Sequence, residues 1–411
     1  MKRHLIGIGG VGMSALATAL VRLGDEVTGA DRTLGTPNIR FLEARGVKVF
    51  PDDGSGVDAA TDEVIVSTAI EADNPGLVRA QERGIPVTHR ARALARTLSD
   101  RRLVAVVGTC GKSTVTAMLG HVLAECGFDP FCVNGANVPG WEGAVRFGRG
   151  EFAVAEVDES DRSLTAFTPW AAVVTNASAD HYSKEEMDEV FDAFIANLPG
   201  PCIDGRVTPW PLAPDELDDL AAGVPVPGRH NLQNAALAVA MAVRLGADPV
   251  AARRAMASFG GVERRLQRHS GASGSVVFDD YAHNPEKLRA MWTTLADRYP
   301  KGVCAVWRPH GYAPLRKMME ALAEMFAATL RPQDLLLVLP VYDAGGTADR
   351  SVSSADLVAR LDGRVRTETV ADLDAAFVRM DAVRGDFGCL VTCGARDPGL
   401  PGLARRLAAG G

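Results

Sequence analysis

The residues best suited to chemistry form a short glycine-rich stretch after an apolar run. The stretch is Gly108-Thr109-Cys110-Gly111-Lys112-Ser113-Thr114. The apolar run at 103–107 predicts a buried strand, and the segment 115–126 is typical of a helix. A glycine turn lets backbone N–H groups approach phosphates, a helix start favours negative charge, and Lys112 adds a positive charge. The hydroxyl of Ser113 or Thr114 can hold Mg²⁺. The stretch therefore predicts a site for the phosphates of a nucleotide.

A second glycine-rich turn lies near the N-terminus. Gly7, Gly9 and Gly12 stand in the spacing G-x-G-x-x-G between an expected strand at 4–8 and an expected helix at 13–23, and Asp31 ends the next expected strand. In dinucleotide-binding proteins this spacing lets the backbone approach a diphosphate, and the acid contacts a ribose. The pattern predicts a nucleotide site, although a simple packing turn between strand and helix stays an open alternative.

Carboxylates follow another expected strand, in the second part of the chain. The apolar run that starts at Phe152 ends in Glu156, Asp158 and Glu159. Mg²⁺ prefers oxygen ligands and keeps phosphate and water in its shell, so this cluster suits a metal beside a phosphate loop. A solvated acidic turn is the alternative. A further expected strand, at 171–176, leads to His181, which is a second candidate metal ligand.

The elements that must position these residues alternate along the whole chain. Expected strands and helices follow one another through residues 1–99, and again from 275 to the end. This alternation predicts an α/β fold with mainly parallel sheets. The proline-rich stretch at 199–228 predicts a long irregular connector. His230 or Asn231 could cap the helix that follows it, and Asn234 could contact a base edge.

Length and composition limit the class of protein. A chain of 411 residues is too long for one ordinary core, so two or three domains are expected. The net charge of −7 argues against a nucleic-acid partner. Seven cysteines without a C-x-x-C pair favour a reducing, cytoplasmic compartment. Glycines interrupt the apolar N-terminus, which argues against a signal peptide, and no apolar stretch reaches membrane-spanning length.

Eight motifs occur in a fixed order and together are highly specific. They are Gly9-Gly10-Val11-Gly12-Met13-Ser14, Val66-Ser67-Thr68-Ala69-Ile70 with Asp73-Asn74-Pro75, Gly108-Thr109-x-Gly111-Lys112-Ser113-Thr114, Asp158-Glu159-Ser160, Asp180-His181, Gly228-Arg229-His230-Asn231-x-x-Asn234, Arg264-Arg265, and Asp280-Tyr281-Ala282-His283-Asn284-Pro285. In this order they resemble the motifs of the Mur ligase family, and the similarity covers nearly the whole chain. The first segment is most similar to members that add L-alanine to UDP-N-acetylmuramate and to members that reattach a recycled tripeptide.

The resemblance implies an ATP-dependent ligase that forms an amide bond through an acyl phosphate. It implies a Rossmann-like domain at 1–99 for a UDP-sugar, a shortened P-loop ATPase-type domain at 100–268, and a Rossmann-like domain at 269–411 for the amine. The implied cofactors are ATP and Mg²⁺, and the implied partners are small molecules: a UDP-N-acetylmuramate-type nucleotide sugar and an amino acid or short peptide. We expect a cytoplasmic monomer or weak homodimer with no membrane or nucleic-acid partner.

The resemblance also implies a role for individual residues. Lys112, His181 and His283 are the expected catalytic residues. The expected ATP-binding residues are Gly108, Thr109, Cys110, Gly111, Lys112, Ser113, Thr114, Asn234 at adenine, Arg265 at a phosphate and Asp280 at the ribose. The expected metal ligands are Ser113, Thr114, Glu156 and His181. The expected UDP-sugar residues are Gly9, Gly10, Val11, Gly12, Asp31 and Ser67. The expected amine-binding residues are His310 and Arg316.

Three departures from the family pattern leave the substrates open. The stretch between His181 and Gly228 is short, His283-Asn284 stands where alanine-adding members usually carry two histidines, and Gly311 replaces a typical arginine. Arg316 could substitute for that arginine. Three alternatives remain: a ligase for a carboxylate outside peptidoglycan, a non-catalytic nucleotide-binding member, and a dehydrogenase-like NAD protein suggested by the first segment alone.

Overall fold

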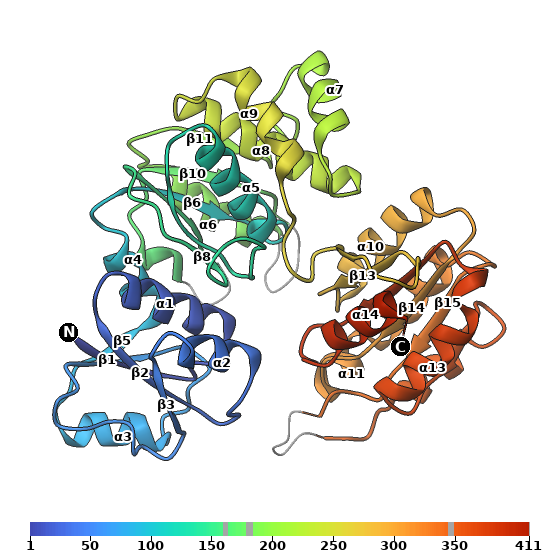
Figure 1. The fold of residues 1–411 in the computed structure, drawn as a ribbon, viewed down its shortest axis with the longest axis horizontal. Helices are drawn as coiled ribbons and strands as arrows, with labels where there is room; N and C mark the ends of the chain where they lie inside the picture. The colour runs from blue at the N-terminus through green and yellow to red at the C-terminus, as the bar shows by residue number, and fades with distance from the viewer. Residues whose placement is uncertain (159–162, 178–183, 344–348, 411) are drawn as a thin grey trace. The chain divides into compact units, whose positions relative to one another are not determined.

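The chain forms three sheets with helices packed on their faces (Figure 1). The computed structural model describes residues 1–158, 163–177, 184–343 and 349–410. Two compact units are present, one made of residues 1–225 with 231–262, the other of residues 226–230 with 263–411. Parallel pairs dominate all three sheets, which confirms the predicted α/β class. The domain bounds at 99 and 268 stay predictions.

The first sheet has five parallel strands in the order β3-β2-β1-β4-β5. Its strands are β1 (Lys2–Ile6), β2 (Glu26–Asp31), β3 (Lys48–Pro51), β4 (Glu63–Val66) and β5 (Val87–His89). Its helices are α1 (Val11–Arg22), α2 (Pro37–Glu43), α3 (Pro75–Glu82) and α4 (Arg90–Thr97). Leu5 of β1 packs in the cluster that contains α1, α2 and α4, whereas its neighbour Ile6 packs with Ala80 of α3. Helices therefore cover both faces of this sheet (Figure 1).

The second sheet has six strands in the order β11-β10-β6-β9-β7-β8, with only β7 and β8 antiparallel among its described pairs. Its strands are β6 (Arg102–Val107), β7 (Phe131–Val133), β8 (Val145–Arg146), β9 (Phe152–Glu156), β10 (Ala171–Val174) and β11 (Cys202–Asp204). The helices around it are α5 (Lys112–Glu125), α6 (Lys184–Ile195), α7 (Pro214–Gly223), α8 (Arg229–Arg244) and α9 (Pro249–Ala255), with the 3₁₀ turns η1 (Ser163–Ala166) and η2 (Met256–Ser258). Because β6 lies between β9 and β10, the carboxyl ends of these three strands meet at one edge.

Two local predictions about this region are wrong. The stretch at 199–228 is not wholly irregular, because it contains β11 and α7. Pro214 stands at the first helical position of α7, where its missing N–H and fixed φ favour a helix, and Arg253 of α9 forms ion pairs with Glu216 and Asp219 of α7. Helix α8 begins before His230, so neither His230 nor the residue after it is an N-cap.

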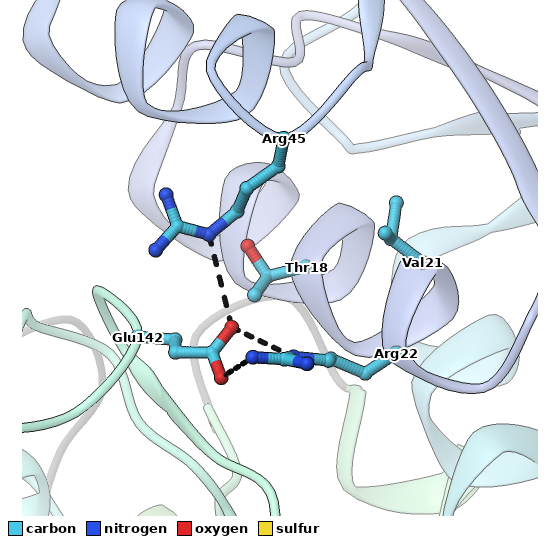
Figure 2. Close-up of a pocket in the computed structure, with 5 residues that line it drawn as sticks. All are labelled: Thr18, Val21, Arg22, Arg45 and Glu142. Atoms are coloured by element: carbon cyan, nitrogen blue, oxygen red, sulfur yellow. Dashed lines mark hydrogen bonds and ion pairs between the residues drawn. The ribbon is translucent and has the colours of Figure 1, made fainter.

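The first and second sheets share one apolar core and are also joined by charged side chains. The core cluster contains Leu16 of α1 together with Phe131 of β7. Glu142 extends from the loop between β7 and β8 and accepts a hydrogen bond from Arg22 Nε at 2.8 Å, while Arg45 Nε lies 3.7 Å from the same carboxylate (Figure 2). These three residues border a cavity of about 300 Å³. The loop before β8 is thus attached to the helices of the first sheet.

The third sheet has the order β12-β13-β17-β14-β15-β16 and is parallel except for β12. Its strands are β12 (Gln267–His269), β13 (Val277–Asp280), β14 (Val303–Trp307), β15 (Leu335–Val338), β16 (Thr367–Thr369) and β17 (Cys389–Cys393). Its helices are α10 (Pro285–Arg298), α11 (Tyr312–Thr329), α12 (Ser354–Leu361), α13 (Leu373–Val383) and α14 (Leu400–Ala409), with the 3₁₀ turn η3 (Arg384–Asp386). One apolar cluster joins the sheet to α10, α11 and α12, and another joins its opposite face to α13 and α14.

No helix among the described residues is both long and apolar enough to cross a membrane.

Candidate functional site

The predicted strand–turn–helix arrangement is present at the phosphate loop. Strand β6 ends at Val107, the loop follows, and α5 begins at Lys112. Gly108 has a φ of 125° and Gly111 a φ of 86°, values that favour glycine. A methyl group on Gly108 would lie 2.2 Å from Thr175 Oγ1, and one on Gly111 would lie 2.6 Å from Asn234 Oδ1. Both glycines are therefore required by backbone conformation and by the close approach of neighbouring side chains.

Thr175 and Asn176 hold the loop from the neighbouring strand. Asn176 Oδ1 accepts hydrogen bonds from Thr109 Oγ1 at 2.7 Å and from the backbone N–H of Cys110 at 3.0 Å, and Asn176 Nδ2 donates to the Cys110 carbonyl at 2.9 Å. Thr175 Oγ1 donates to the same carbonyl at 2.6 Å. Neither residue is among the site residues expected from the sequence. Their position directly after a strand that neighbours β6 is the signal that could have identified them.

Lys112 lies over its own loop. Its Nζ donates a hydrogen bond to the Gly108 carbonyl at 2.7 Å and lies 4.0 Å from the Asp158 carboxylate. Ser113 and Thr114 are buried in the first turn of α5. The ammonium group and the two hydroxyls therefore share the start of one helix, as the motif predicts, and this is where phosphate oxygens are favoured.

Glu156 ends β9, beside the phosphate loop. Its backbone pairs with Val106 of β6, and its Oε2 accepts a hydrogen bond from the N–H of Gly135 at 2.8 Å. Glu156, Ser113 and Thr114 carry oxygen atoms of the kind that Mg²⁺ prefers, and their role as metal ligands stays a prediction. No cluster of three or more His, Cys, Asp or Glu side chains suited to a metal occurs among the described residues. The predicted ligand His181 lies outside them, as do the motif residues Glu159, Ser160 and Asp180.

Asn234 is buried in α8, and its side-chain oxygen faces Gly111 of the phosphate loop. The structure therefore brings the predicted adenine-binding residue to the loop that is predicted to hold phosphates. Its contact with a base edge stays a prediction.

The glycine turn after β1 is held by its own polar neighbours. Asp31 Oδ2 accepts a hydrogen bond from the N–H of Gly9 at 2.9 Å, and Asp31 Oδ1 accepts one from the N–H of Thr33 at 2.9 Å. Asn38 Nδ2 donates to the Gly9 carbonyl at 2.9 Å. Asp31 thus positions the turn. Ser67 follows the neighbouring strand β4, so the structure brings it to the same edge of the sheet.

Residues 10–12 begin α1 beside that turn. Gly10 is the N-cap of α1 and has no side-chain capping bond, while Val11 and Gly12 form the first helical positions. The predicted UDP-sugar residues therefore gather at a positively polarised helix start.

In the third sheet, His283 and His310 come together from the ends of β13 and β14. Their ring centroids lie 4.8 Å apart in an edge-to-face arrangement. His283 Nδ1 lies 2.9 Å from the Tyr281 carbonyl, which can only accept, so Nδ1 carries the proton and Nε2 presents a lone pair. Burial lowers the pKa of His283 to about 4 and also lowers the pKa of His310. Both rings are neutral at pH 7.

Asp280 fixes the segment that leads into the third sheet. Its two carboxylate oxygens accept hydrogen bonds from the N–H groups of Leu266 and Ala282, each at 2.7 Å. Burial raises the pKa of Asp280 above its ordinary value, against the opposing effect of Arg265. The Arg265 guanidinium lies 5.2 Å from the centre of the Tyr281 ring. Asp280 and Arg265 are therefore neighbours, and their contacts with ATP stay predictions.

Within the described residues, Arg316 forms no hydrogen bond or ion pair with His283 or His310. Its guanidinium instead pairs with the Asp349 carboxylate at 2.8 Å and donates to Ser351 Oγ at 3.1 Å. The prediction that Arg316 holds the amine is untested.

Sequence comparisons identify relatives along nearly the whole chain. The family description "Mur ligase family, catalytic domain" matches residues 2–102, and "Mur ligase, glutamate ligase domain" matches residues 264–396. The chain is 37% identical to the UDP-N-acetylmuramate–L-alanine ligase of Rubrobacter xylanophilus over 440 aligned positions, which cover 97% of each chain. It is also 37% identical to the enzyme of that name from Paenarthrobacter aurescens, covering 96% of this chain and 94% of the relative. The alignment of 440 positions is longer than this chain of 411 residues, so the Rubrobacter relative carries extra residues.

Solved structures share this fold. The UDP-N-acetylmuramate–alanine ligase of Thermotoga maritima superposes with a TM-score of 0.80 at 25% identity, covering 99% of this chain and 98% of that one. A murein peptide ligase of Psychrobacter arcticus shares the fold, with a TM-score of 0.67 at 19% identity and coverage of 99% and 98%.

Proposed function

Because the chain belongs to the Mur ligase family, we propose that it joins L-alanine to the carboxylate of UDP-N-acetylmuramate while ATP is converted to ADP and phosphate. The observation that carries the proposal is the end-to-end similarity to relatives named for that reaction, together with an intact phosphate loop. We further propose that the reaction takes place in the cytoplasm, where ATP and nucleotide sugars are available.

The first half of the reaction activates the carboxylate. A carboxylate is a poor electrophile, and transfer of the γ-phosphoryl group of ATP converts one of its oxygens into a good leaving group. Lys112 and the N–H groups at the start of α5 stabilise the charge of the transferring group, because they are fixed in place before the reaction. Thr175 and Asn176 keep the loop in the required conformation.

Mg²⁺ fits the oxygen ligands beside the loop. Ser113, Thr114 and Glu156 would hold it, and when bound it would neutralise charge on the phosphate oxygens. Gly135 donates its N–H to Glu156 and thereby orients the carboxylate.

The second half of the reaction is attack by the amine on the acyl phosphate, with release of phosphate. His283 presents its Nε2 lone pair, which can accept a hydrogen bond from the amine and orient the nitrogen for attack. A pKa of about 4 makes His283 a weak base, so we assign it a positioning role for the uncharged amine.

The test is product identification by mass spectrometry. The protein is incubated with UDP-N-acetylmuramate, ATP, Mg²⁺ and each of a panel of amino acids and short peptides. The proposal predicts a new nucleotide sugar whose mass corresponds to one added alanine, formed only when all components are present. A product with a different amine would replace L-alanine as the substrate, and no product with any amine would contradict the proposal.

A further inference from the structure

Arg90 lies against the first turn of α1. It follows β5 directly and begins α4, where His89 caps the helix by accepting a hydrogen bond from the N–H of Ala91 at 3.3 Å. A methyl group on Gly12 would lie 3.1 Å from Nη1 of Arg90 and 3.5 Å from its Cζ. The half-buried guanidinium is therefore in close contact with the backbone of the glycine-rich turn.

This contact lies near the point where the strand order of the first sheet reverses. From β1 the chain moves outward through β2 to β3, and from β4 it moves outward in the opposite direction to β5. The strand order therefore reverses between β1 and β4, and ligands of open α/β sheets bind outside the carboxyl ends of the strands at such a reversal. Gly7, after β1, and Ile70, after β4, approach each other there. Arg90 extends from the end of β5 to this reversal.

The other charged groups around the turn already have partners. Asp31 accepts hydrogen bonds from two backbone N–H groups. Arg32 forms ion pairs with Asp52 and Glu71. Arg96, on the same helix as Arg90, pairs with a carboxylate of β4.

Arg90 differs from these groups, because within the described part of the chain its guanidinium makes no ion pair and no hydrogen bond. A guanidinium presents a planar set of donors that matches the oxygens of phosphate groups. Its contact with Gly12 places the guanidinium beside the glycine-rich turn at the strand reversal, where the sugar nucleotide is expected.

We propose that Arg90 is a substrate-binding residue that contacts the diphosphate of the nucleotide sugar. This inference rests on the proposed function, because that function places a uridine diphosphate group at the turn. Arg90 contributes to ground-state binding of the nucleotide sugar and does not take part in phosphoryl transfer from ATP.

The experiment compares Arg90→Gln and Arg90→Lys with Arg92→Gln, a control on the exposed face of the same helix. Calorimetry measures the affinity of each protein for UDP, UDP-N-acetylmuramate and ATP–Mg²⁺. We expect Arg90→Gln to weaken binding of both uridine nucleotides at least tenfold and to leave ATP binding within twofold of wild type. Arg90→Lys should recover part of the loss, and Arg92→Gln should change nothing beyond twofold.

Kinetics supply a second readout that a purely structural role would not produce. Arg90→Gln should raise KM for UDP-N-acetylmuramate at least tenfold, with kcat and the melting temperature nearly unchanged. Unchanged affinity for UDP and UDP-N-acetylmuramate in Arg90→Gln, with normal binding by the wild type, would overturn the role of Arg90 alone. Failure of the wild type to bind either nucleotide would overturn both this inference and the proposed function.

Discussion

At the scale of single residues, the phosphate loop shows how a short motif specifies local chemistry. Strand, glycine turn, lysine and hydroxyls are contiguous in sequence, so their arrangement follows from backbone conformation and could be predicted. Asn176 could not be assigned in the same way. It contacts Cys110 from far along the chain, and only the pairing of β10 with β6 brings the two together.

The first prediction concerns Lys112, whose ammonium group is expected to stabilise the transferring phosphoryl group. Lys112→Ala should lower kcat by a factor of about 10²–10³, because a positioned charge at the reacting group is lost. The melting temperature should change little, because Lys112 is half-buried at the start of α5 and is not part of the apolar core. Steady-state ATP turnover measures the effect, with Lys317→Ala on the exposed side of α11 as the control. Near-normal turnover by Lys112→Ala would refute the assignment.

At the scale of elements, one segment holds the phosphate loop and another holds the candidate metal ligand Glu156. The end of β10 holds the phosphate loop through Thr175 and Asn176. The loop between β7 and β8 holds Glu156 through the N–H of Gly135, and its Glu142 is paired with the helices of the first sheet. The β7–β8 loop therefore connects the first sheet's helices to the candidate metal ligand, a connection that no local motif reveals.

The second prediction tests the support from β10. Asn176→Ala removes three hydrogen bonds to the loop and should lower the free energy of unfolding by about 1–3 kcal/mol. It should also raise KM for ATP about tenfold, because loss of a 1.4 kcal/mol interaction changes an equilibrium tenfold. Asn176→Asp, which can still accept but cannot donate to the Cys110 carbonyl, should be intermediate. Urea unfolding and ATP kinetics measure both effects, and an unchanged KM would show that the loop forms without this support.

The third prediction tests Glu156. Glu156→Gln keeps an acceptor for the Gly135 N–H but removes the negative charge that Mg²⁺ requires. The Mg²⁺ concentration that gives half-maximal activity should rise about tenfold or more, with stability unchanged. Glu151→Gln, at the other end of the same strand region, is the control. An identical Mg²⁺ titration for Glu156→Gln and wild type would exclude Glu156 as a ligand.

At the scale of the whole molecule, the α/β fold class follows from the alternation of strands and helices and could be predicted without structural information. The structure of regions with a weak hydrophobic pattern could not be predicted in this way. Prolines suggested an irregular connector at 199–228, yet Pro214 begins a helix because a proline is well tolerated at the first helical position. The contact of Arg90 with Gly12 depends on the order of strands in the first sheet, which hydrophobic patterning does not determine.

The fourth prediction concerns stability and pH. His4 is 1% exposed, its Nδ1 lies 2.9 Å from Thr28 Oγ1, and burial lowers its pKa to about 4 from the ordinary 6.5. Between these values the unfolded chain binds a proton that the folded chain does not. The stability that the folded protein gains by keeping His4 neutral is therefore fully present above pH 6.5. It is lost as the pH falls towards 4. Lowering the pH from 7 to 5 should reduce the free energy of unfolding by about 2 kcal/mol through His4 alone.

Urea unfolding of wild type and His4→Asn at the two pH values measures this contribution, and the difference between the proteins removes the effect of other titrating groups. Asp279 requires that comparison, because burial raises its pKa to about 6 and gives the opposite pH dependence. We expect a smaller loss of stability in His4→Asn. Equal losses in the two proteins would show that His4 does not cause the acid sensitivity.

In the proposed reaction, this Mur ligase activates a carboxylate by phosphorylation before an amine attacks it. The most direct test uses UDP-N-acetylmuramate with ¹⁸O in its carboxylate, ATP, Mg²⁺ and L-alanine, and follows the label by mass spectrometry. The acyl-phosphate mechanism predicts that one ¹⁸O appears in the released phosphate for each amide bond formed, with ADP as the other product. Unlabelled phosphate, or label in AMP, would contradict it.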